Sequence, residues 1–73
     1  MSRHLTAVIE QEEGGYVSFC PELDIASQGD TVETAQSNLK EALELFFVTA
    51  SESEIEQRSS GQVFVSSVDV AVG

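Results

Sequence analysis

The segment 32–49 constrains the fold most, because its apolar residues recur at spacings of three and four positions. The stripe consists of Val32, Ala35, Leu39, Ala42, Leu43 and Phe46. Such spacing predicts an amphipathic helix of about 18 residues with one face turned toward a core. Phe47 lies beside the stripe, so it either widens the core face or meets a partner. The chain is therefore expected to contain one long helix that needs a second layer to cover its apolar face.

The residues just before this segment are suited to starting a helix. Gly29 permits a turn, and either Asp30 or Thr31 is a good N-cap. Glu33 stands three residues after Asp30, as in a variant of the capping box, and places negative charge at the positive end of the helix dipole. We therefore assign Gly29, Asp30 and Thr31 to a structural junction between a strand and the helix.

Before the junction, apolar residues follow the two-residue period of β-strands. Segments 4–10 and 16–20 alternate, and the glycine-bearing stretch 11–15 between them predicts a hairpin turn. Pro21 lacks an amide donor and should end the second strand, so it also belongs to the structural junction. Residues 23–28 then predict a short third strand.

After the helix, the polar and serine-rich segment 51–61 is expected to be a loop or a frayed helical end. Valines alternate again in 62–72, which predicts a last strand, and the parity slips at Ser66-Ser67 as in a β-bulge or a bend. The fold class is therefore α+β. We expect a small, antiparallel-rich sheet of three to four strands with one helix packed on one face, in the order βββαβ. Residues 1–73 form a single domain in this interpretation.

A sheet that is covered by a helix on one face leaves its other face open. If Val8, Val17, Phe19 or the valines of the last strand point that way, the exposed apolar patch needs a partner. A chain of 73 residues also buries only about 60% of its unfolded surface, so its core is small. We therefore expect assembly into a homo-oligomer.

Charge limits the classes of partner. The sequence holds 13 acidic residues against 3 Lys and Arg, a net charge of -10. Nucleic-acid binding relies on Lys and Arg to displace counterions, so direct binding of DNA or RNA is not expected. The same charge steers a basic protein toward the chain, although many soluble proteins are acidic without such a partner. With no long apolar segment, the chain is expected in the cytoplasm and without membrane association.

The residues show no catalytic pattern. Cys20 has no neighbouring base in the sequence and two acidic neighbours, Glu22 and Asp24, so a packed small side chain is its ordinary role. His4 is the single histidine and forms neither a metal set nor a triad. The spacing of Glu22, Asp24 and Asp30 matches no calcium loop, and no glycine segment has the lysine-bearing pattern of a phosphate loop. We therefore predict no enzyme, no catalytic residue, no metal site and no cofactor.

The stretch from Tyr16 to Phe47 resembles the HicB-type antitoxin family, whose members are the small partners of HicA-type toxins. The family pattern is a hairpin, a phrase close to F-P-D-L-x-G-x-x-T-x-G-D-T-x-E-E-A, a helix with a K-E-A-L-like segment, and a final strand. The matching residues are Phe19, Pro21, Glu22, Leu23, Gln28, Gly29, Asp30, Thr31, Glu33, Ala35 and the segment 39–43. The chain departs from the pattern at Asp24-Ile25, where Pro-Gly is frequent. It resembles a short, stand-alone HicB-type domain, expected to be without the C-terminal DNA-binding domain that full HicB antitoxins usually carry.

The resemblance implies a partial RNase H-like fold and a partner. By resemblance, that partner is a small basic toxin that cleaves mRNA, and the acidic chain would neutralise it by covering its RNA-binding and active-site surface. We assign Glu22 and Asp24 to that contact. The alternative hypothesis is a solitary homo-oligomeric module, structural or regulatory, with no cognate toxin. An enzyme that uses Cys20 or the carboxylates is a third hypothesis.

Overall fold

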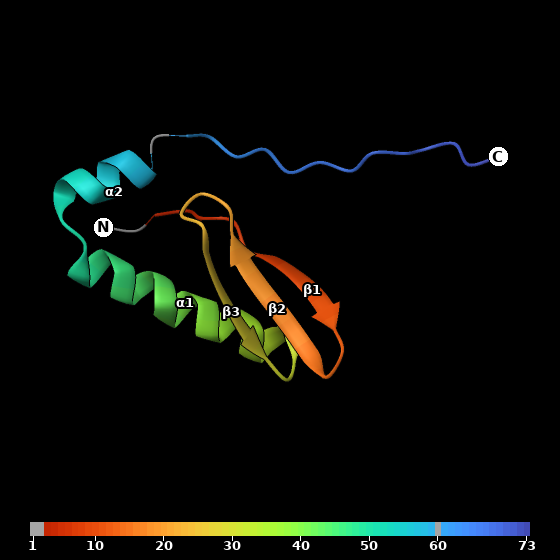
Figure 1. Cartoon of the computed structure of the whole chain (residues 1–73), viewed down its shortest axis with the longest axis horizontal. Helices are drawn as coiled ribbons and strands as arrows, with labels where there is room; N and C mark the ends of the chain where they lie inside the picture. Colours follow the sequence, from red (N-terminus) through yellow and green to blue (C-terminus); the bar gives the residue numbers. More distant parts are fainter. Residues whose placement is uncertain (1–2, 60) are drawn as a thin grey trace.

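The computed structural model describes residues 3–59 and 61–73 (Figure 1). Its elements follow in the order β1 (Val8–Glu12), β2 (Gly15–Cys20), β3 (Ile25–Gly29), α1 (Val32–Thr49) and α2 (Glu52–Arg58). The expected α+β class is confirmed, because a three-stranded antiparallel sheet is followed by the long helix.

The sheet is a meander in which β2 lies between β1 and β3. Glu12 pairs with Gly15, so the hairpin turn consists of Glu13 and Gly14 only. Gly14 adopts a φ of 86°, a left-handed conformation that favours glycine. The expected hairpin is confirmed, although its turn is shorter and its first strand begins later than the alternation indicated.

The structure shows which of the two expected residues is the N-cap of α1. Thr31 is the N-cap, and its side-chain oxygen accepts a hydrogen bond from the Thr34 backbone N–H at 3.0 Å. The third residue after the cap is therefore Thr34, so the capping-box pairing of Glu33 with Asp30 was wrong. Glu33 does lie in the first turn, where its charge favours the helix dipole.

The core lies between α1 and the sheet face formed by β2 and β3. Cys20, Leu23 and Leu39 form its buried centre. Packed against them are Leu5, Ile25, Leu43, Phe46 and Phe47. Phe47 therefore widens the core face, which was one of its two expected roles.

A buried hydrogen bond fixes α1 on the middle strand. The Ser18 hydroxyl donates to the carbonyl oxygen of Ala35 at 2.7 Å, and both residues are fully buried. A buried hydroxyl is costly without a partner, so this contact favours one position of the helix along β2.

Gly29 serves the junction by its lack of a side chain. A Cβ atom at Gly29 would lie 2.5 Å from the backbone nitrogen of Ala35 and 2.8 Å from the carbonyl carbon of Thr34. Both atoms belong to the first turn of α1, so only glycine lets the end of β3 pass this close to the helix. The sequence indicated a turn at Gly29, and the structure adds this close approach as the physical reason for glycine.

The expected last strand was wrong. Within the residues that the structure describes, the sheet ends at β1 and β3, and the tail (residues 61–73) is extended without pairing to either (Figure 1). The order is therefore βββα with a short second helix, not βββαβ. One physical reason is that Ser51 caps a second helix whose Arg58 bonds to the backbone of Leu23, so the chain leaves α2 at the corner and extends away from the sheet (Figure 1).

Candidate protein-interaction surface

The corner between β2 and β3 is a tight turn held by the core. β2 ends at Cys20, directly before Pro21, as the missing amide donor predicted. The Asp24 backbone N–H donates to the carbonyl oxygen of Cys20 at 2.8 Å, while Leu23 is buried to 1% exposure. Asp24 has a φ of 56°, the left-handed conformation that Asp tolerates better than most residues. The corner therefore anchors Leu23 inward and leaves Asp24 exposed.

Glu22 is engaged inside the molecule. Its two carboxylate oxygens accept the Thr6 backbone N–H at 3.1 Å each, and one of them accepts the Thr6 hydroxyl at 2.7 Å. Partial burial opposes ionisation of the carboxyl, but the hydrogen bonds from Thr6 outweigh it, so the pKa of Glu22 lies below its ordinary value. Glu22 therefore ties the segment before β1 to the corner.

Cys20 lies under the same carboxylate. Its thiol is fully buried and donates to Glu22 at 3.4 Å. Burial, assisted by the Glu22 charge, raises the pKa of the Cys20 thiol despite hydrogen bonds from the backbone of Leu23 and Glu22. A protonated, buried thiol is poorly suited to nucleophilic chemistry.

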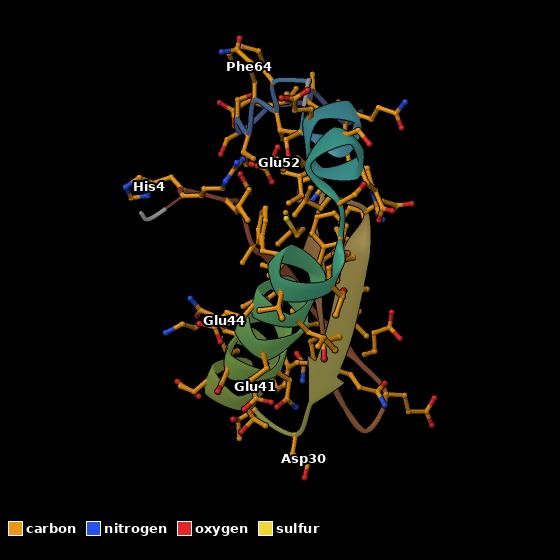
Figure 2. All side chains as sticks on the ribbon, turned by 90° about the vertical axis from the view of Figure 1, so that its left-hand side faces the viewer. His4, Asp30, Glu41, Glu44, Glu52 and Phe64 are labelled. Atoms are coloured by element: carbon orange, nitrogen blue, oxygen red, sulfur yellow. The ribbon has the colours of Figure 1, made fainter. Side chains whose placement is uncertain are left out.

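Residues 3–59 and 61–73 contain no group of three or more His, Cys, Asp or Glu side chains that is placed to hold a metal ion. His4 is exposed and projects away from the body of the molecule in Figure 2. In the same described ranges, no helix is both long enough and apolar enough to cross a membrane.

Arg58 of α2 contacts the corner between β2 and β3, and the sequence did not predict this contact. Its guanidinium donates to the carbonyl oxygen of Leu23 and lies over the Phe46 ring, 5.0 Å from the ring centroid. Arg58 reaches the corner because residues 52–58 form α2, where a loop or a frayed helical end was expected. The signal was present in Ser51 and Glu54, since the Ser51 hydroxyl accepts the Glu54 N–H at 3.2 Å in an S-x-x-E capping sequence.

Exposed carboxylates gather along α1 and at both of its ends. Glu33, Glu41 and Glu44 form the acidic face of α1, on which Lys40 is the one base. Figure 2 shows Glu41 and Glu44 pointing outward from the helix, with Asp30 below its start and Glu52 above its end. These side chains create a negative field over the side of the molecule that faces away from the sheet.

The sheet face opposite α1 is apolar at the end that lies next to the corner between β2 and β3. Ser18 and Cys20 face the helix, so the strand alternation turns Val17 and Phe19 to the other side. Val8 pairs with Phe19 and shares that open face, and both side chains are 36% exposed. Of the residues that the sequence offered for the uncovered face, Val8, Val17 and Phe19 point that way, whereas the valines of 62–72 belong to no strand within the described residues.

Comparison with known proteins gives three relatives that carry the same description. A UPF0150 protein of Helicobacter pylori is 35% identical over 68 residues, which covers 92% of this chain and 94% of the relative. Two UPF0150 proteins of Synechocystis sp. are 49% and 51% identical over 47 and 43 residues. Those two alignments cover 62% and 56% of this chain, and 65% and 54% of the relatives. No family model and no solved structure matches the chain.

Proposed function

The chain belongs to the UPF0150 family, and from that premise we propose that it is an antitoxin-like binding protein that neutralises a small basic toxin. The sequence resemblance to HicB-type antitoxins supplies the partner class, a HicA-type toxin that cleaves mRNA. The chain would act by covering the RNA-binding and active-site surface of the toxin, and no chemical step by the chain itself is needed.

The observation that carries the proposal is the exposed Asp24 carboxylate on a corner that the core holds in place. Leu23 anchors the corner from inside, and Arg58 bonds to its backbone. A carboxylate on such a corner binds a basic side chain with little loss of backbone entropy. Glu22 then acts as a positioning residue, because its oxygens are already used by Thr6.

The acidic face of α1 has a separate part in the proposal. Its carboxylates attract a basic toxin at long range and compete there with the RNA phosphates. Charges outside a contact change mainly the association rate and its salt dependence, whereas a charge inside the contact changes the dissociation rate. The two groups of acids can therefore be separated kinetically.

The test begins with the tagged full chain purified from its own host at low and high salt. A retained small basic protein is assayed for RNA cleavage and for inhibition by the chain. We expect inhibition that weakens as salt increases, because the Debye length falls to about 8 Å at physiological ionic strength. Failure to retain a basic protein, or retention of one that cleaves no RNA, would contradict the proposal.

Variants then locate the contact. Asp24→Lys should raise the dissociation rate at every salt concentration, whereas Glu41→Lys with Glu44→Lys should lower the association rate at low salt only. Glu13→Lys is the matched control for Asp24→Lys, since Glu13 is exposed in the hairpin turn at the opposite end of the sheet. Equal effects of Asp24→Lys and Glu13→Lys would remove the corner from the contact.

A second candidate function is a solitary homo-oligomeric module without a toxin. The open apolar face with Val8 and Phe19 favours it, because such a patch is typical of surfaces that associate. Self-association of the purified chain, together with no basic partner at either salt concentration, is the result that would select this alternative.

A further inference from the structure

The tail combines strong strand character with almost complete exposure. Its large apolar side chains are between 67% and 93% exposed, apart from the half-buried Val63. They are Phe64, Val65, Val68, Val70 and Val72. β-Branched residues in alternation favour a pleated, half-buried strand, and the tail is extended (Figure 1) but has no paired strand within the described residues.

The two edges of the sheet differ in how far α1 protects them. At β3, the Asn38 side chain of α1 donates to the carbonyl oxygen of Gln28 at 2.7 Å, and α1 packs along this strand. At β1, α1 makes few contacts, and the strand is largely exposed. An edge strand presents alternate N–H and C=O groups to an incoming strand, so β1 is the more accessible of the two edges.

The direction in which the tail extends favours pairing with a sheet edge of another copy. Gly61 to Phe64 lie near Arg3 to Leu5, at the end of the molecule where the chain approaches β1. From there the tail runs away from the helices and the sheet as an extended trace (Figure 1). Eleven residues in 62–72 span roughly 36 Å when extended, about twice the length of the five-residue β1.

Charge favours the tail as the point where two copies meet. The whole chain has a net charge of -10, and this opposes the approach of two bodies. The tail contributes only Asp69 to that charge. A contact made by the tail therefore joins two acidic bodies through a segment with a single charged side chain.

We propose that residues 62–72 of one copy add as a fourth strand to the β1 edge of a second copy, and that the second copy returns the same contact. A reciprocal exchange closes with two-fold symmetry and pairs the tail of each copy with the β1 edge of the other. Main-chain hydrogen bonds to β1 supply the attachment, and side chains of the tail pack beside those of β1. This inference does not depend on a toxin, so it stands or falls separately from the proposed function.

The first test is sedimentation analysis of the full chain over a range of concentrations. Native chain should form a dimer or an even-numbered assembly. Val68→Asp with Val70→Asp should weaken the association on the order of 100-fold, because two carboxylates would have to be placed beside β1, which already carries Glu10 and Glu12. Val48→Asp is the matched control, since Val48 is an exposed valine on α1, and it should leave the association unchanged.

The second test follows amide hydrogen exchange of native chain at concentrations below and above the association midpoint. Alternate amides of β1 and of 62–72 should exchange more slowly in the assembly, whereas the outer amides of β3 should not change. A monomer at all concentrations would overturn the proposal. An assembly in which the outer β1 amides remain unprotected would overturn it as well.

Discussion

β2 and the tail have similar apolar alternation but end in opposite environments. β2 lies between two strands and under α1, with Ser18 and Cys20 fully buried. The tail has valines at two-residue spacing on either side of the slip at Ser66-Ser67, yet all but the half-buried Val63 are exposed and none is paired within the described residues. The difference shows that alternation makes a segment prone to form a strand, while a neighbouring edge and a covering layer decide whether it joins a sheet.

The largest expected difference between the two regions comes from side-chain truncation. Leu39→Ala should lower the free energy of unfolding by about 2–4 kcal/mol, because Leu39 is 1% exposed and its removal leaves a cavity under α1. Val70→Ala should change it by less than about 0.5 kcal/mol in the monomer. Urea titration at a concentration where the chain is monomeric measures both. Equal losses would mean that the tail packs on its own body.

Glycine substitutions give a smaller but more local contrast. Gly29→Ala should cost about 1–3 kcal/mol, because its Cβ would meet the backbone of Thr34 and Ala35 and force α1 away from β3. Gly61→Ala is the control, since no atom lies within 4 Å of the added Cβ. The same urea titration compares them. A stable Gly29→Ala variant would show that α1 can move away from β3 without loss of packing.

The smallest expected effect is a dependence on pH. The folded pKa of Glu22 is lower than its ordinary value of 4.5, so its contribution to stability is present above that value and disappears as the pH falls through the folded pKa. Glu22→Gln should therefore cost up to about 1 kcal/mol at neutral pH and little at low pH. Asp69→Asn, which removes a carboxylate from the tail, should shift stability little at either pH. Urea titrations across this range test the difference, and parallel curves for native chain and Glu22→Gln would exclude the proposed role of Thr6.

The sequence predicted the features that depend on neighbours along the chain. The stripe of α1 identified the buried Leu39, Pro21 marked the end of β2, and Thr31 was one of the two expected caps. Strand alternation offered Val8 and Phe19 as candidates for the open face, and the register selected them. Each of these depends on spacing of a few residues, which periodicity and capping rules describe well.

The contacts that the sequence did not predict join distant positions. Arg58 bonds to Leu23 across 35 positions, and Glu22 bonds to Thr6 across 16 positions. No local rule selects the partner of a single arginine or glutamate. The missing pairing of the tail has a related cause, because a strand-like pattern does not say which edge, or which copy of the chain, provides the neighbour.

The meander order of the sheet has a consequence for the time course of folding. β1 pairs with β2, β2 pairs with β3, and α1 follows β3 directly and covers it. Most contacts between elements therefore join segments that follow one another along the chain. Such low contact order favours rapid folding, with little entropy lost before contacts form. The sheet and α1 can therefore form without the tail, and strand exchange between copies becomes a later, bimolecular step whose rate increases with protein concentration.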